Sequence, residues 1–270
     1  MALDAAIMTP DLSAGAPDAP PALDVRRVSH SYGDRKALDG VSFAVPQGSF
    51  TALLGPNGAG KSTLFSLVTR LFNVRDGEIR ILGRRLNEEP GEALRRLGVV
   101  FQARTLDLDL SIRQNLKYHA ALHGMTGAEA SRRIAEILRG SELVDRMGEK
   151  ARNLSGGQLR RIEIVRAFMH RPRLILLDEP TVGLDIRSRA EIVSEVRRLV
   201  KDEGVSVLWA THLIDEIDET DRVVVLHNGK VLAEGNVPDI VAAESAGSIR
   251  DAFTRLTGLA KSTVEPEMAS

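Results

Sequence analysis

Short apolar runs alternate with amphipathic stretches along most of the chain, and this alternation is typical of an α/β protein. The runs that predict β-strands are 23–28, 38–45, 49–54, 77–82, 99–101, 174–178, 205–210 and 223–227. Apolar residues at helical spacing predict helices over residues 62–72 and about 186–201. We therefore expect a mostly parallel sheet with helices on both faces, and a functional site in the loops at the strand ends.

Two local patterns refine this expectation for individual strands. Residues 77–82 alternate apolar and polar side chains and stop at Gly83, which favours an edge strand. Asn228 and Gly229 follow the apolar run 223–227 directly, and this dipeptide predicts a hairpin into a further strand.

The pattern changes to helices alone between about residues 104 and 170. Ser111 is placed to cap one helix, and Thr126 with Glu129 forms a capping box before a second. Ser155 opens a third helix. Because this block interrupts the strand–helix alternation, we expect an inserted helical subdomain.

The two ends of the chain differ in composition from the middle. The first 22 residues are rich in Ala, Pro and Asp and contain no Lys or Arg, so they predict a disordered acidic leader rather than a secretory signal. Residues 23–243 are expected to form the folded domain, and residues 244–270 a short C-terminal tail.

Composition narrows the possible chemistry. The chain of 270 residues has a formal net charge of −1, so its total charge gives no sign of nucleic-acid binding. The absence of cysteine excludes disulfides, cysteine-based zinc sites and thiol catalysis. No uninterrupted apolar run exceeds four residues, and a membrane-spanning helix needs about 20. We therefore expect no membrane span and no nucleic-acid partner.

Residues 55–63 read GPNGAGKST, the pattern of a phosphate-binding loop between a strand and a helix. Glycines let backbone N–H groups turn toward phosphate oxygens, and the helix adds its positive dipole end. Lys61 is expected to reach the β- and γ-phosphates, and Ser62 to offer its hydroxyl to Mg²⁺. The expected nucleotide-binding residues of the loop are Gly55, Pro56, Asn57, Gly58, Ala59, Gly60, Lys61, Ser62 and Thr63.

Two carboxylates follow the apolar run LILL at residues 174–177. An Asp at the end of a central strand can hold Mg²⁺ beside a phosphate loop, so Asp178 is the candidate metal ligand. Glu179 would then be free to orient and polarise the attacking water. An ordinary acidic strand end is the alternative, and the neighbouring phosphate loop favours the catalytic interpretation.

Residues 154–158 read LSGGQ directly before a predicted helix. Ser155 would cap such a helix in any protein, and the helix N-terminus with two glycines also forms an anion site. This pentapeptide is the signature of the ATP-binding cassette (ABC) ATPases, which the chain resembles over roughly residues 23–240. The resemblance implies a P-loop NTPase fold with an N-terminal antiparallel β subdomain and an inserted α-helical subdomain.

Each family motif has a counterpart in this chain, in the family's order. Tyr32 matches the aromatic residue that stacks on adenine, and Gln102 matches the glutamine that touches Mg²⁺ and the attacking water. His212 matches the histidine that contacts the γ-phosphate, and Asp185 lies in the loop that crosses the dimer. The resemblance thus implies that Glu179, His212, Gln102 and Lys61 act in catalysis, that Ser62, Gln102 and Asp178 bind Mg²⁺, and that Tyr32, the phosphate loop, Ser155, Gly156, Gly157, Gln158 and Asp185 bind ATP.

The resemblance also implies partners and a location. In this family two subunits pack head to tail, with each ATP between the phosphate loop of one and the signature of the other. Such a homodimer forms in the ATP-bound state and drives a separate transmembrane permease subunit docked near Gln102. The chain would accordingly lie on the cytoplasmic face of the cell membrane.

The finer resemblance is to ABC-2 exporters, through TVGLD at 181–185 and TLDLDLSIRQNL at 105–116. Within that branch, the stretch resembles ATPases found beside quinoprotein alcohol dehydrogenase systems. At positions 181 and 182 many family members carry Ser followed by a small or polar residue, whereas this chain has Thr181 and Val182.

Two alternative functions stay open, an importer ATPase and an ABC ATPase acting on nucleic acid or ribosomes. Many importer ATPases carry a larger regulatory domain after the histidine, whereas 58 residues follow His212. ABC ATPases acting on nucleic acid or ribosomes usually carry a coiled-coil insertion, zinc cysteines or a second cassette, none of which is visible here. The transported substrate is left open, because its recognition belongs to the membrane subunit.

Two further patterns are read as ordinary surface features. His119 and His123 lie one helical turn apart and could form a metal pair, but the Glu that a zinc protease needs after the first His is missing. Arginine pairs at 95–96, 132–133, 160–161 and 197–198 are expected on solvated helix faces.

Overall fold

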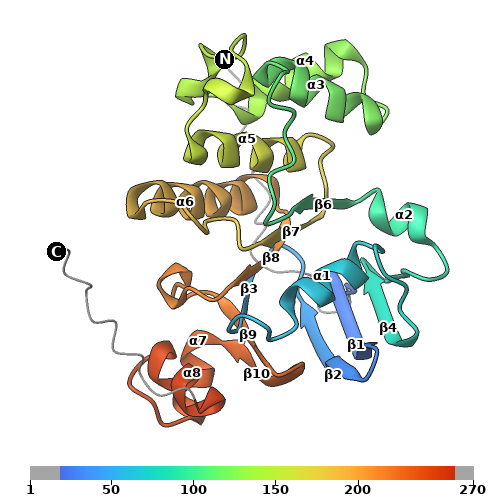
Figure 1. Ribbon diagram of the computed structural model, residues 1–270, viewed down its shortest axis with the longest axis vertical. Coiled ribbons are helices and arrows are strands. Elements are labelled where there is room, and N and C mark those ends of the chain that lie inside the picture. The colour runs from blue at the N-terminus through green and yellow to red at the C-terminus, as the bar shows by residue number, and fades with distance from the viewer. Residues whose placement is uncertain (1–18, 259–270) are drawn as a thin grey trace, which may run out of the picture.

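Two β-sheets organise the chain in the computed structural model, which describes residues 19–258 (Figure 1). The first sheet is antiparallel with the order β2-β1-β4-β5, and its strands are β1 (Leu23–Tyr32), β2 (Arg35–Val45), β4 (Asp76–Ile81) and β5 (Arg84–Arg85). The second has the order β10-β9-β3-β8-β7-β6, and its strands are β3 (Phe50–Leu54), β6 (Leu97–Val100), β7 (Leu174–Asp178), β8 (Ser206–Thr211), β9 (Arg222–His227) and β10 (Lys230–Asn236). Only β10 is antiparallel to its neighbour in this second sheet.

Helices cover both faces of the second sheet. The helices of the described chain are α1 (Lys61–Val68), α2 (Pro90–Leu94), α3 (Ile112–Leu122), α4 (Gly127–Ile137), α5 (Gly156–Phe168), α6 (Ile186–Glu203), α7 (Val237–Ala243) and α8 (Ile249–Thr257), with short 3₁₀ turns at Glu142–Val144, Ala151–Asn153 and Ile214–Glu216. Between β6 and β7 the chain is helical and forms a separate lobe that contains α3 and α4, drawn in green in Figure 1. These features confirm the predicted P-loop NTPase fold class.

The central strands are buried on both faces, as a parallel sheet requires. Along β7, Ile175 and Leu177 pack into the cluster shared with α5 and α6, whereas Leu174 and Leu176 pack into the cluster shared with α1 and the first sheet. A third cluster lies between β3, β9 and the C-terminal helices α7 and α8. Near-continuous apolar runs such as LILL follow from this two-sided burial.

The structure corrects the position of one predicted strand. Residues 77–82 were expected at a sheet edge, but β4 lies between β1 and the two-residue strand β5. The alternating pattern of 77–82 reports one exposed face of the sheet. It carries no information about which strands pair on either side.

The end of one helix and the C-terminal segment also differ from the sequence expectation. Helix α1 stops at Val68 rather than at residue 72, because Arg70 adopts a positive φ of 60°. Residues from 244 onward were expected to form a tail, but α8 packs Ala252 and Phe253 against the third cluster. Most of the expected leader, residues 1–18, and residues 259–270 lie outside the described part of the chain.

No helix within residues 19–258 is long and apolar enough to cross a membrane.

Candidate active site

The phosphate loop lies between β3 and α1, at the carboxyl edge of the central sheet. Gly60 has a φ of 110°, and a Cβ at this position would come within 2.8 Å of the Ala37 carbonyl oxygen. Only glycine fits this turn without displacing the backbone of β2. Helix α1 begins without a side-chain cap and without an acidic residue in its first turn. Its N-terminal N–H groups therefore remain available to an anion.

Lys61 is almost fully buried beneath this loop. Its ammonium donates hydrogen bonds to the carbonyl oxygens of Gly55 (2.7 Å) and Pro56 (3.1 Å). It also pairs with Glu179 Oε1 at 3.1 Å. The loop is thus folded around its own cation, which lines the cleft beside the loop.

Glu179 occupies the centre of the predicted catalytic group. It follows the end of β7 with a positive φ of 45°, a conformation that is uncommon for residues other than glycine and that clusters at functional sites. Its carboxylate lies 3.2 Å from His212 Nδ1 and accepts a 3.5 Å hydrogen bond from Gln102 Nε2. The side chains of Lys61, Gln102 and His212, drawn from three different segments, thus converge on one carboxylate.

Asp178 lies one residue earlier and is also buried, with 5% of its surface exposed. Burial raises the pKa of Asp178 above its ordinary value, and a hydrogen bond with Ser62 opposes the rise. Its buried Oδ1 has no hydrogen-bond partner among the described residues. A buried carboxylate oxygen without a donor, beside a serine hydroxyl, fits the all-oxygen coordination that Mg²⁺ prefers.

The cleft beside these residues has a volume of about 720 Å³, within the usual range for small-molecule sites. The predicted residues that line it are Tyr32, Asn57, Gly58, Ala59, Gly60, Lys61, Ser62, Thr63, Gln102, Glu179 and His212. The structure thus brings the aromatic residue, the phosphate loop and the catalytic group to one cavity. Gly55 and Pro56 do not line the cavity, but their carbonyl oxygens accept hydrogen bonds from Lys61 beneath it.

Tyr32 lies at the mouth of the cleft with 48% of its surface exposed. Its ring meets His30 edge-on at 4.9 Å and Phe72 edge-on at 5.9 Å, while His30 and Phe72 stack on each other. His30 and Phe72 support this ring and were not predicted from the sequence. Their separation along the chain hides the contact, which arises because α1 ends beside β1.

The signature residues lie outside this cleft. Ser155 caps α5 by accepting a hydrogen bond from the Gln158 backbone N–H, and the Ser155 backbone N–H donates to Gln158 Oε1. Neither these residues nor Gly156 and Gly157 line the 720 Å³ cavity. Asp185 does not line it either, because its carboxylate caps α6 through Ser188. Ser155 and Asp185 are both exposed.

Arg160 is a site residue that the sequence analysis misread. It was expected on a solvated face, but only 7% of its surface is exposed. Its guanidinium donates to the carbonyl oxygens of Pro180 (2.6 Å), Phe101 (2.8 Å) and Gln102 (3.1 Å), and pairs with Glu163 at 2.9 Å. Arg133 of the pair at 132–133 is likewise buried. The sequence contained one sign of this burial, the Glu three residues after Arg160 that could pair with it. Such pairs are also common on exposed helices, so the sign was weak.

Glu216 is a second residue that sequence reasoning missed. Its buried carboxylate accepts hydrogen bonds from Thr181 Oγ1, from Trp209 Nε1 (2.9 Å) and from Thr211 Oγ1 (2.5 Å). The Thr211 carbonyl in turn accepts a bond from Gly55 N at 3.1 Å. Glu216 therefore ties the loop after Glu179 to the strand that supports the phosphate loop.

Comparison with known proteins agrees with this geometry. The family described as ABC transporter matches residues 38–182. A solved structure described as the ATP binding subunit of an ABC transporter superposes with a TM-score of 0.77 at 30% identity, covering 87% of this chain and 99% of that one.

Three similar proteins differ in the transport that their names describe. The linearmycin resistance ATP-binding protein LnrL of Bacillus subtilis (strain 168) is 35% identical over 81% of this chain and 70% of its own. The Nod factor export ATP-binding protein I of Rhizobium meliloti (strain 1021) is 37% identical over 84% and 67%. The spermidine/putrescine import ATP-binding protein PotA of Pseudomonas aeruginosa (strain UCBPP-PA14) is 36% identical over 84% and 61%.

Proposed function

The chain belongs to the ABC transporter family, as a nucleotide-binding subunit that hydrolyses ATP, and from this premise we propose that it powers an exporter by pairing with a second copy of itself. The observation that carries the pairing is the separation of the site into two parts. The cleft holds the phosphate loop and the predicted catalytic group, whereas Ser155–Gln158 lie at a helix end elsewhere, where Ser155 is exposed and the other three residues are half-buried. A second subunit would supply its signature to this cleft, and Asp185 would lie along the shared surface.

Exposed apolar residues support this contact surface. Ile186, directly after Asp185, has 83% of its surface exposed, and Val182 beside the cleft is also exposed. Large apolar side chains left in water beside a functional cleft are typical of interaction surfaces. They would become buried when the two subunits close over the nucleotides.

The proposed roles of the cleft residues follow from their contacts. Asp178 and Ser62, with Gln102, would hold Mg²⁺, which neutralises charge on the phosphate oxygens. Glu179 would accept a proton from the attacking water, with His212 and Gln102 beside it to orient that water and the γ-phosphate. Lys61 would exchange its contact with Glu179 for phosphate oxygens.

Export is the proposed direction because resistance and export appear in the names of two of the three relatives described above. The third relative is named for import, so import is the alternative direction to be tested. A separate membrane subunit would dock after Gln102, where Leu108, Tyr118 and Leu122 are exposed. The chain would then lie on the cytoplasmic face of that membrane. An adjacent gene for a membrane subunit would support this role, and the adjacent genes would also test the expected association with quinoprotein alcohol dehydrogenases.

Substitution of Ser155 by arginine tests the composite site. In a Glu179→Gln background, Mg-ATP should convert monomers to dimers, because the bound γ-phosphate is consumed slowly. Adding Ser155→Arg should abolish the dimer, since a bulky side chain blocks the close approach of the signature helix to phosphate. Light scattering would report the mass, and a nucleotide titration of the monomer should give an unchanged affinity.

Ser111→Arg is the matched control for this experiment. Ser111 caps α3 with the same type of capping box, so its loss has the same local cost of about 0.5–2 kcal/mol without touching the signature. The control should still dimerise. Normal dimerisation of Ser155→Arg, or loss of ATP binding by its monomer, would show that LSGGQ does not act on the partner's nucleotide.

Substitution of Tyr32 by alanine tests stacking on the base. Stacking on an aromatic side chain is worth about 1–3 kcal/mol, so the ATP dissociation constant should rise about 5- to 150-fold. Tyr32→Phe keeps the ring and should stay near the wild-type value. ATP and GTP should differ only modestly, since stacking reads little of the base edge. An unchanged constant in Tyr32→Ala would assign the side chain to packing against His30 and Phe72 and to its contact with Thr63.

A further inference from the structure

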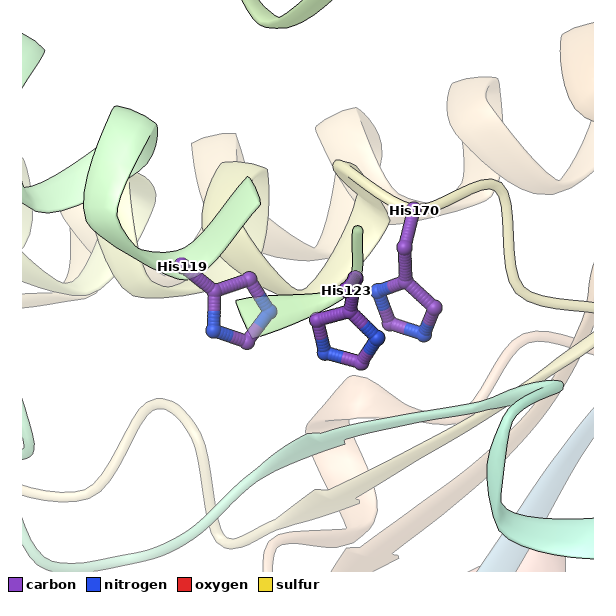
Figure 2. Close-up of side chains that lie close together, drawn as sticks. All are labelled: His119, His123 and His170. Carbon is purple, nitrogen blue, oxygen red and sulfur yellow. The ribbon is translucent and has the colours of Figure 1, made fainter. Parts of the chain in front are cut away.

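Three of the six histidines in the chain meet far from the cleft (Figure 2). His119 and His123 come from the end of α3, and His170 follows α5 in the turn that leads to β7. One ring nitrogen from each lies within 4.8 Å of the others. From the sequence, His119 and His123 were considered as a metal pair and set aside because no Glu follows His119 as a zinc protease requires; His170 was not considered, since it is distant in sequence.

The hydrogen bonds of these rings leave ligand atoms free. His170 Nε2 lies 3.1 Å from the Leu97 carbonyl oxygen, to which it can only donate. Its Nδ1 then carries the lone pair, and this buried atom has no hydrogen-bond partner among the described residues. His119 Nε2 is buried and without a partner in the same way. A backbone carbonyl that fixes the tautomer of a histidine is the usual support of a metal ligand.

We propose that His119, His123 and His170 bind one Zn²⁺ ion, with water in the fourth position. Three imidazoles and an open position are a common zinc set, with Zn–N bonds of about 2.0–2.1 Å. Tetrahedral geometry then places the nitrogens about 3.3 Å apart. The described nitrogens lie within 4.8 Å of one another, so the rings must move closer to bind the ion. His123, exposed beyond the last residue of α3, can turn its ring away from the 3.8 Å stack with His170.

The two half-buried rings of the cluster carry no charge near pH 7, although the neighbouring Arg166 and Arg133 do. Burial, with the neighbouring charges of His123, Arg166 and His170, lowers the pKa of His119 to about 3, and burial lowers that of His170 to about 4. These rings are therefore neutral near pH 7, the form that binds metal. Arg166 is held by the Thr105 carbonyl, and Arg133 pairs with Glu203 at 2.6 Å.

A metal at this point would join segments of two parts of the fold. His119 and His123 belong to the helical lobe, whereas His170 contacts the start of β6 through Leu97. Zn²⁺ would therefore fasten α3 to the junction of α5 with the central sheet. We expect bound metal to raise the thermal unfolding midpoint, since it binds the folded chain alone.

Zinc titration of the full chain tests this site. The protein is purified without a histidine tag, stripped with a chelator, and titrated with Zn²⁺ against a chromophoric chelator at pH 7.5. One equivalent per chain is expected, accompanied by a rise in the unfolding midpoint. Co²⁺ in place of Zn²⁺ should give the visible absorption of a tetrahedral site.

Three variants locate the ion. His123→Ala removes an exposed ligand with no hydrogen bond to lose, and His170→Gln retains a donor for the Leu97 carbonyl. Loss of a residue that only supports a metal ligand typically weakens metal binding by about 10–100-fold. Each of these two variants removes a ligand itself and should therefore weaken Zn²⁺ binding by more than this. His227→Ala removes a histidine outside the cluster and should bind as the wild type does. Absence of zinc binding, or equal binding by the wild type and both cluster variants, would overturn the proposal. The second outcome would assign the ion to another site, such as Asp178.

Discussion

Replacing Lys61 with alanine should lower the rate of ATP turnover by about 10³- to 10⁵-fold, the range supplied by a cation that stabilises a transferring phosphoryl group. Lys61 is 5% exposed and lines the cleft from beneath the phosphate loop. Its loss removes a fixed positive charge from the place where the β- and γ-phosphate oxygens are expected. Nucleotide affinity should fall as well.

Phosphate release by purified protein measures this effect, and a nucleotide titration measures the affinity. Lys201→Ala, an exposed lysine at the end of α6, is the matched control and should keep wild-type turnover. Because Lys61→Ala also leaves Glu179 buried without its cation, an unfolding curve should accompany the assay. Turnover near the wild-type rate in a folded Lys61→Ala variant would remove the basis of the proposed site.

Glu179→Gln should hydrolyse ATP at least about 100-fold more slowly while still binding it, because loss of a general base costs about 10²–10⁴-fold. The amide keeps the shape of the side chain and can still contact Gln102 and His212, but it cannot take a proton from water. Mg²⁺-dependent binding should persist, since Asp178 and Ser62 remain.

Asp178→Asn is the paired variant that separates the two carboxylate roles. It should lose the Mg²⁺ dependence of nucleotide binding, which a titration with and without Mg²⁺ would detect. If Glu179→Gln instead loses that dependence and Asp178→Asn keeps it, the two assignments are exchanged.

Local patterns predicted the parts of this molecule that local forces decide. The capping serines Ser111 and Ser155 and the apolar run of β7 were found because each acts within a few residues. The proposed catalytic pair at 178–179 was identified because it ends such a strand. The lateral place of β4 could not be found, since alternation describes the faces of a strand and not its neighbours.

The missed residues depend on contacts between distant segments. Arg160 was taken for a surface residue because its acceptors are backbone carbonyls, which no side-chain pattern reveals. His170 joins His119 and His123 only after α5 and α3 have packed together. The location of Ser155 outside the cleft likewise depends on the whole fold.

The pair between Lys61 and Glu179 also bears on how the site is cleared after each turnover. Both groups are buried, so a lone ammonium there would be costly once phosphate departs. Glu179 is a tethered anion 3.1 Å away, and in the proposed site it would compete with phosphate for the same cation. Part of the binding energy of ATP would then go into displacing Glu179 from Lys61. The same competition would favour release of inorganic phosphate, so the proposed general base would also help to clear the site.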